Sequence, residues 1–440
     1  MVGITKMKAE KQKAEKEAFF CTTKELSRLG LEQIPTQFQS HKHLIYSSPA
    51  TLAFNSPGAE GFGVKRAGLA VPDSIMLIVA PGCCGRNTSL ISSMKEYNDR
   101  FYYLMMDETD IVTGRHLKKI PKAVEEICSV CPKKPSVVMI CITCVDALLG
   151  TDMERVCKKA EEQVEIPVRP CYMYALTREG RKPPMVHVRQ SLYSLLEPGK
   201  KKGNVVNLLG FFSPLVDDCE IYDLLHSAGV KTIHEISRCK DYMEYQTMSE
   251  ANFNLVLHHE ARFAAEDFHN RLQIPVIELR RLYQIDKIEN QYHALGNALG
   301  VAFYDEKYKK QAEDALEKFR QRCPDASFAI GECLNADPFE LSLALIRYGF
   351  SVPEIYGTIT VENFTYIRSL AKISPETKVF SNMEPTMIYY DPAKSDVNLA
   401  IGKDACYYHP DCPYVMWNGE EQPYGYAGVR RLFEQLLEVV

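Results

Sequence analysis

Short apolar segments recur along most of the chain, and amphipathic segments separate them. The apolar segments are mostly continuous rather than alternating with polar residues, which is typical of strands that helices cover on both faces. This pattern predicts parallel sheets. The expected strands cover residues 74–80, 100–106, 136–142, 204–212, 230–236, 253–258, 275–279, 327–332, 351–357, 377–381 and 397–402.

The amphipathic segments between these strands predict helices. In residues 116–128 the apolar side chains keep a helical period and fall on one face. In residues 213–229, Ser213 suits the N-cap and Pro214 the first turn of a helix. Similar helices are expected over residues 308–323 and 337–350. The alternation of strands and helices predicts an α/β protein of doubly wound, Rossmann-like domains with mostly parallel sheets.

Two breaks in this alternation divide the chain into three such domains. Residues 197–204 are rich in glycine and lysine, and residues 320–327 follow a long helical segment. The first 20 residues are strongly charged. At roughly 150 residues per domain, three domains also suit the length of the chain. We therefore expect a charged N-terminal arm at residues 1–20 and α/β domains at residues 21–200, 201–322 and 323–440, the last ending in a helix.

Composition and charge narrow the class of protein. Hydrophobic residues make up 46% of the chain and charged residues 25%, as in globular proteins with a core. The net charge of −5 offers no basic field for nucleic acid or anionic lipid. No apolar run reaches the roughly 18 residues of a membrane span. The N-terminus lacks the apolar segment of a signal peptide, so we expect a cytoplasmic protein whose 15 cysteines are reduced.

Three cysteines follow the ends of expected strands. Cys83 and Cys84 lie in the Gly- and Pro-rich turn after residues 74–80, and Cys144 follows residues 136–142. Parallel strands end at one edge of a sheet, where α/β proteins bind cofactors. Thiolates at such an edge favour an iron–sulfur cluster over hydrolytic chemistry, which uses histidines and carboxylates. The alternative is that these cysteines are inert residues of the core.

Further cysteines and one histidine have spacings that metal sites use. The two C-x-x-C pairs are consistent with a four-cysteine zinc site or with simple packing in the core. The C-x-x-H-x-x-C segment is consistent with a metal site or with a loop that holds cysteines by chance. No phosphate-binding G-x-x-x-x-G-K-[ST] loop is present, so ATP binding of that kind is not expected. The residues are Cys128 and Cys131, Cys141 and Cys144, and Cys406, His409 and Cys412.

Four segments resemble, in the same order, segments of the nitrogenase component 1 family. The second of them, "CITCVDALLGTDMERVCKKAEE", resembles the cluster-binding segment, in which Thr-Cys at the end of a strand precedes a short apolar turn, Gly and Asp, and a helix. The resemblance extends over about residues 20–440 and implies the fold expected above. The family includes nitrogenase, protochlorophyllide and chlorophyllide reductases, other tetrapyrrole and sulfur-compound reductases, and cofactor-assembly scaffolds. The segments cover residues 56–85, 141–162, 204–233 and 422–440.

This resemblance implies a set of cluster ligands. Cys144 and Cys84 match two family ligands, with Cys83 as the alternate for Cys84. Where the family usually has a further cysteine, this chain has Phe54, followed by Asn55 and Ser56. Two cysteines instead of three imply a [4Fe–4S] cluster shared across a subunit interface, and not the eight-iron cluster of nitrogenase.

The resemblance also bears on a second site. Nitrogenase anchors its molybdenum cofactor with one Cys and one His, and His258 falls where the Cys is expected. Residues 412–426 hold no counterpart of the anchoring His. Dinitrogen is therefore not the expected substrate, and His258 is expected to be an axial ligand or a proton donor to another substrate, a second metallocofactor or a tetrapyrrole. The alternative is a histidine packed at the end of a strand.

The resemblance implies an oxidoreductase subunit. It would pair with an identical or paralogous component 1 subunit and accept low-potential electrons from a separate homodimeric, ATP-binding iron–sulfur reductase. The interface cluster would pass these electrons to a bound substrate or metallocofactor. Two alternatives stay open: a non-catalytic scaffold for the assembly of a nitrogenase-type metallocofactor, and a zinc-stabilised α/β protein without redox function.

Overall fold

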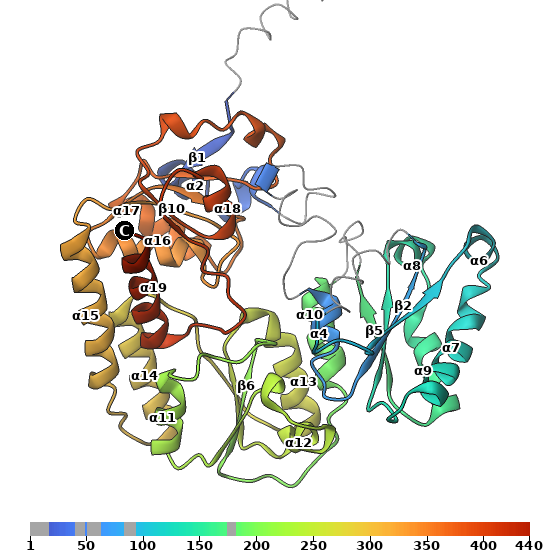
Figure 1. Ribbon diagram of the computed structural model, residues 1–440. Coiled ribbons are helices and arrows are strands. Elements are labelled where there is room, and N and C mark those ends of the chain that lie inside the picture. Colours follow the sequence, from blue (N-terminus) through green and yellow to red (C-terminus); the bar gives the residue numbers. More distant parts are fainter. Residues whose placement is uncertain (1–16, 40–48, 51–62, 83–93, 174–181) are drawn as a thin grey trace, which may run out of the picture. The chain divides into compact units, whose positions relative to one another are not determined.

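The computed structural model contains three sheets, each with helices beside it (Figure 1). The chain forms two compact units. The first unit holds residues 1–56, 315–418 and 432–440, and the second holds residues 57–314 and 419–431. The structure describes residues 17–39, 49–50, 63–82, 94–173 and 182–440.

The first sheet of the second unit has four parallel strands in the order β3-β2-β4-β5. Helices α7 and α9 pack against one face, and α4 and α10 against the other (Figure 1). The elements around this sheet are α4 (Val64–Gly68), β2 (Ile75–Ala80), β3 (Phe101–Met105), α6 (Glu108–Thr113), α7 (His116–Val130), β4 (Val138–Ile142), α8 (Cys144–Leu149), α9 (Met153–Val164), β5 (Val168–Tyr172) and α10 (Pro184–Tyr193).

Strand β2 shows why its sequence forms a central strand. Successive side chains of a strand point to opposite faces of the sheet. Ile75 and Leu77 lie in the core beneath α7 and α9, while Met76 and Ile78 lie in the core shared with α4 and α10. Both faces are therefore apolar, as the continuous apolar segment predicts for a buried parallel strand.

The second sheet of the second unit is also parallel, in the order β7-β6-β8-β9. Helix α10 packs against α13 as well as against β5, so one hydrophobic core connects the two sheets. The elements are β6 (Val205–Leu209), α11 (Glu220–Ser227), β7 (Thr232–His234), α12 (Tyr242–Gln246), β8 (Phe253–Val256), α13 (Arg262–Leu272), β9 (Val276–Glu278) and α14 (Ile285–Leu299). The next helix, α15 (Glu306–Arg322), begins in the second unit and ends in the first.

The helix expected from Ser213 begins later, at Glu220, and its N-cap is Cys219. The residues before it have other backbone partners. The amide of Leu215 donates to the Glu235 carboxylate over 2.9 Å. The amide of Val216 donates to the carbonyl oxygen of Gln422 over 3.1 Å. Because every buried backbone group needs a partner, these pairings replace the first helical turns.

The first unit contains a sheet of six strands in the order β1-β12-β11-β10-β13-β14, in which only β1 is antiparallel to its neighbour. The sequence pattern predicted four of these strands and missed β1 and β14, which are very short. The elements are β1 (Phe20–Thr22), α2 (Thr23–Leu29), β10 (Ser327–Ile330), α16 (Pro338–Arg347), β11 (Ser351–Tyr356), α17 (Phe364–Ile373), β12 (Lys378–Phe380), β13 (Leu399–Ile401), α18 (Lys403–Tyr408), β14 (Tyr414–Val415) and α19 (Gly425–Val439).

These three sheets confirm the α/β fold class with mostly parallel sheets. Apart from β1, their strands fall within residues 75–172, 205–278 and 327–415. The domain boundaries near residues 200 and 322 stay a prediction. Among the helices of the described residues, none has the length and apolar character to cross a bilayer.

Candidate functional site

The predicted cluster site lies at the carboxyl edge of the first sheet. Strands β2 and β4 are parallel neighbours, with Val79 opposite Ile142. The chain therefore leaves the sheet at the same edge after β2 and after β4. Helix α8 begins directly after β4, with Thr143 at its N-cap and Cys144 as its first residue. This arrangement places the backbone of Cys144 at the edge where Rossmann-like sheets bind their ligands.

The other predicted ligands cannot be placed in the same way. Cys83 and Cys84 lie outside the described residues, which stop at Gly82 before them. The segment around Phe54 also lies outside them. For Cys144 the structure describes the backbone alone. The ligand set of the cluster therefore stays a prediction.

Two buried polar atoms beside Cys144 have no hydrogen-bond partner among the described residues. They are Oγ1 of Thr143 and Oδ2 of Asp146, from residues that are 2% and 1% exposed. Buried polar atoms are almost always hydrogen-bonded, so a partner for these two is expected from outside the described residues. The Thr143 hydroxyl does not cap α8 and has no acceptor among the described residues. A donor next to a cysteine suits a thiolate-bound cluster, whose sulfur atoms accept hydrogen bonds.

Asp146 fixes α8 to the rest of the domain. Its Oδ1 atom accepts hydrogen bonds from Nε2 of His116 over 2.8 Å and from the hydroxyl of Thr151 over 3.0 Å. Nδ1 of His116 lies 3.0 Å from the carbonyl oxygen of Asp110. The ring thus links the Asp110 backbone to the Asp146 carboxylate. This buried pair joins α7 to the helix that begins with Cys144.

The two C-x-x-C pairs do not form one site. Cys141 in β4 lies opposite Cys171 in β5, and both are fully buried. The hydrogen bond to Cys141, together with burial, raises the pKa of Cys171 well above its ordinary value, so this thiol stays protonated. Cys131 lies elsewhere, with its sulfur 3.1 Å from the hydroxyl of Tyr102. Within the described part of the chain, no three His, Cys, Asp or Glu side chains are grouped to hold a metal ion.

The C-x-x-H-x-x-C segment begins in α18 and continues past its end, and its three side chains have different partners. The thiol of Cys412 donates to the carbonyl oxygen of Val397 over 3.6 Å. Nε2 of His409 instead lies 3.2 Å from a Glu354 carboxylate oxygen and 2.8 Å from the hydroxyl of Tyr390. His409 therefore belongs to a buried polar cluster of the first unit and is not a metal ligand together with these cysteines.

His258 lies at the end of β8, at the N-cap of a short 3-10 helix, η6 (His259–Ala261). Its Nδ1 atom accepts a hydrogen bond of 3.4 Å from the Glu260 amide. The ring stacks on that of His259, with 4.5 Å between centroids, and its edge contacts Phe211. The side chain is 33% exposed. The hydrogen bond at Nδ1 and the ring contacts thus hold the imidazole of His258 in place, while part of the side chain stays exposed to solvent.

The surroundings of His258 keep its imidazole neutral. Burial lowers its pKa well below the ordinary value, and the charge of Arg189 lowers it further. His259, Arg281 and Arg262 act in the same direction. Only the neutral imidazole can coordinate a metal or accept a proton. The neutral His258 thus lies among arginines, two of which, Arg189 and Arg262, pair with the carboxylates of Glu260 and Glu278.

Arg189 and Gly210 build this site and were not predicted from the sequence. Arg189 in α10 donates from Nε and Nη2 to the carbonyl oxygen of Gly210, over 3.0 and 2.7 Å, and from Nη1 to Glu260 over 2.7 Å. Gly210 has a φ of 138°, and a Cβ there would lie 2.8 Å from the backbone nitrogen of His258. A lone arginine in an apolar helix and a glycine directly after a strand were the available signals.

Relatives of this chain are named for cofactor biosynthesis. Nitrogenase iron-molybdenum cofactor biosynthesis protein NifE of Sinorhizobium fredii is 25% identical over 418 residues, which cover 89% of this chain and 82% of the relative. The protein of the same name from Nostoc is 25% identical and covers 61% of this chain and 58% of its own. That of Methanosarcina barkeri is 27% identical, with 42% and 43% covered.

Solved structures share the fold. "Nitrogenase Cp1 at pH 6.5" superposes with a TM-score of 0.69 at 18% identity and covers 90% of this chain and 92% of its own. "Nitrogenase Cp1 at pH 5" gives a TM-score of 0.59 at 15% identity, with 93% and 96% covered. The sequence model of the family described as "Nitrogenase component 1 type Oxidoreductase" matches residues 60–440. These matches agree with the resemblance seen in the four segments, and the chain belongs to the nitrogenase component 1 type oxidoreductase family.

Proposed function

We propose that this chain is one subunit of a nitrogenase component 1-like complex that binds an iron–sulfur cluster at the carboxyl edge of its first sheet. Cys144 and Cys84 are the proposed ligands, with Cys83 as the alternate for Cys84. The observation that carries the proposal is the turn from β4 into α8. It places the backbone of Cys144 beside the end of β2, the strand that precedes Cys83 and Cys84 in the sequence.

The number of cysteine ligands in this chain implies a second subunit. A [4Fe–4S] cluster is held by four cysteine ligands, so two per chain leave half of them to another subunit. We therefore propose an identical or paralogous component 1 subunit as the partner. When bound, such a cluster would supply a low-potential site for electrons from a separate ATP-dependent iron–sulfur reductase.

The residues around Cys144 have supporting tasks in this proposal. The buried hydroxyl of Thr143, which lacks a partner among the described residues, would donate to a sulfur atom and so adjust the reduction potential. The pair of Asp146 and His116 would hold α8 at the required orientation. The apolar strands β2 and β4 would keep water from the protein side of the site.

His258 is the proposed contact to the substrate or to a second metallocofactor. Its neutral imidazole and the hydrogen bond at Nδ1 leave Nε2 as the atom to ligate a metal or accept a proton. The lowered pKa supports the ligand role over that of a proton donor, because a donor must first carry the proton. The surrounding arginines would favour an anionic group beside it.

A second candidate is a scaffold on which a nitrogenase-type cofactor is assembled. The names of the relatives favour it, since all three are cofactor biosynthesis proteins. The two candidates differ in turnover. An enzyme would consume ATP and reductant continuously with its reductase and substrate, whereas a scaffold would release one metallocofactor per complex and then stop.

The ligands can be tested by metal analysis and electron paramagnetic resonance of protein purified without oxygen. Cys144→Ala should remove the iron and the cluster signal, and so should Cys84→Ala, while Cys83→Ala should retain both. Cys412→Ala is the matched control, because its thiol donates to a loop carbonyl away from this turn. Iron retained in Cys144→Ala would refute the proposal, and zinc without iron in the unaltered protein would support the zinc-stabilised alternative.

A further inference from the structure

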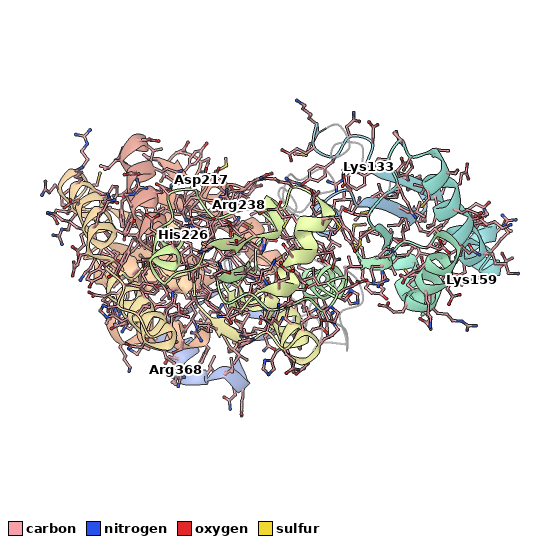
Figure 2. The ribbon with its side chains drawn as sticks, turned by 90° about the horizontal axis from the view of Figure 1, so that it is seen from below. Lys133, Lys159, Asp217, His226, Arg238 and Arg368 are labelled. Atoms are coloured by element: carbon pink, nitrogen blue, oxygen red, sulfur yellow. The ribbon has the colours of Figure 1, made fainter. Side chains whose placement is uncertain are left out.

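Helices α2 and α17 of the first unit pack against each other and line a groove of about 480 Å³. No property of the cluster site depends on this groove. Four of its lining residues are cations, Lys24 and Arg28 from α2 and Arg368 and Lys372 from α17. Arg368 is labelled in Figure 2, and the two cations of each helix lie at least partly exposed.

The four cations form two matched rows. Lys24 and Arg28 are four residues apart on α2, and Arg368 and Lys372 are four residues apart on α17. Residues at this spacing lie one above the other on a single face of a helix. Each helix therefore presents two positive charges, about one turn apart, to the same groove.

These charges are not compensated within the described part of the protein. No carboxylate is among the residues that line the groove. None of the four cations lies in an ion pair with another described residue, and Arg368 lies over the ring of Phe364, 5.7 Å from its centroid. By contrast, Arg238 lies 2.7 Å from a carboxylate oxygen of Asp217 (Figure 2). Like charges one turn apart repel, so the two pairs of cations disfavour the empty groove. A bound anion would remove this repulsion.

The carboxylate of Glu25 on α2 does not neutralise the positive charge of the groove. The carboxylate of Glu25 is engaged at the start of the helix, where it accepts hydrogen bonds from the amide and hydroxyl of Thr22. These bonds, and to a smaller extent the charge of Arg28, lower the pKa of Glu25. Glu25 is not among the residues that line the groove.

Hydroxyl groups complete the lining. Ser27, Thr365 and Ser369 lie among the cations. The hydroxyl of Ser369 donates its proton to the carbonyl oxygen of Thr365 over 3.1 Å, so the donors to a bound anion would come from Ser27 and Thr365. Hydroxyls together with guanidinium and ammonium groups are the donors that proteins use for phosphate and carboxylate oxygens.

We propose that this groove is a binding site for a small polyanion that carries at least two phosphate or carboxylate groups, such as a triphosphate or a tricarboxylate. Its volume falls in the range of sites for small molecules. Arginine can bind such oxygens through two parallel hydrogen bonds, and lysine binds them as a point charge. One anionic group of the ligand would lie between the cations of each turn.

The test is calorimetric titration of the full chain with inorganic triphosphate and, separately, with citrate. We expect saturable binding of one ligand per chain that weakens as salt is added, because exposed charges are screened. The double variant Arg368→Gln/Lys372→Gln should bind at least about tenfold more weakly, since it loses two charge-assisted contacts. The double variant Lys158→Gln/Lys159→Gln, which removes two exposed charges of α9, should bind as the unaltered chain does.

The outcomes separate the sources of the ligand. Binding of triphosphate alone would assign the groove to phosphates, and binding of citrate alone would assign it to carboxylates. The proposal is refuted if neither triphosphate nor citrate binds, or if both double variants lose binding equally. Thermal melting with and without triphosphate provides a second measurement, in which the ligand should raise the melting temperature of the unaltered chain but not that of Arg368→Gln/Lys372→Gln.

Discussion

Arg189 shows how a single buried residue organises a site. Its guanidinium uses two nitrogens to bind one backbone carbonyl, that of Gly210, and a third to bind the carboxylate of Glu260. A buried cation with these partners is compensated locally, yet its field still lowers the pKa of the neighbouring His258. The same residue therefore fixes the turn after β6 and keeps the adjacent imidazole neutral.

Gly210 is the residue on which this turn most depends. We predict that Gly210→Ala lowers the free energy of unfolding by about 1–3 kcal/mol, because φ is positive and the new Cβ would meet the backbone of His258. Urea denaturation measures this loss. Gly203→Ala is the matched control, since a methyl group at that position would have no atom within 4 Å among the described residues, and its loss should be small. Equal losses in the two variants would contradict the close contact.

At the scale of the element, α8 is a short helix whose position comes from outside it. It has six residues, too few to be stable alone, and it ends at Gly150 in the left-handed conformation. The pair of Asp146 and His116 anchors it to α7, and Thr151 closes the following turn on the same carboxylate. The backbone position of the first residue, Cys144, depends on that anchor.

We predict that His116→Ala lowers the free energy of unfolding by about 3 kcal/mol or more, because it leaves the carboxylate of Asp146 buried without its main partner. Denaturation by urea gives the value. His226→Ala is the comparison: His226 is exposed and bonds one carbonyl oxygen, so about 1 kcal/mol is expected. A loss in His116→Ala no larger than that in His226→Ala would show that the pair does not anchor α8.

Strand β5 shows what the sequence pattern could not reveal about elements. The segment "VRPCY" contains Arg169 and Pro170, so it lacks a continuous apolar run and was not predicted. It is an edge strand that pairs only with β4 among the described strands, and an edge tolerates a proline and a partly exposed arginine. Central strands such as β2 and β4 were predicted because both their faces are buried and their sequences must be apolar throughout.

For the whole molecule, the sequence predicted what depends on local pattern and missed what depends on packing between distant segments. The turn with Cys144 could be predicted because a strand, a cysteine and a helix follow one another directly. The groove with Lys24 and Arg368 could not, since these residues are more than 300 positions apart and only the packing of α2 against α17 joins them. The contact between Gly210 and His258 could not be predicted either, because it also depends on packing between separate segments.

The proposed cluster makes a prediction about assembly. If two chains share one [4Fe–4S] cluster, each chain should carry about two iron atoms, and the cluster should hold the pair together. A group that binds only the folded, paired state stabilises that state. Treatment with an iron chelator in the absence of oxygen should therefore lower the melting temperature and dissociate the pair in sedimentation, and the same treatment should leave Cys144→Ala unchanged. A chain that stays paired and equally stable after its iron is removed would require contacts other than a shared cluster to hold the subunits together. A chain that carries little iron alone, and gains it only with a second component 1 chain, would identify the partner as paralogous.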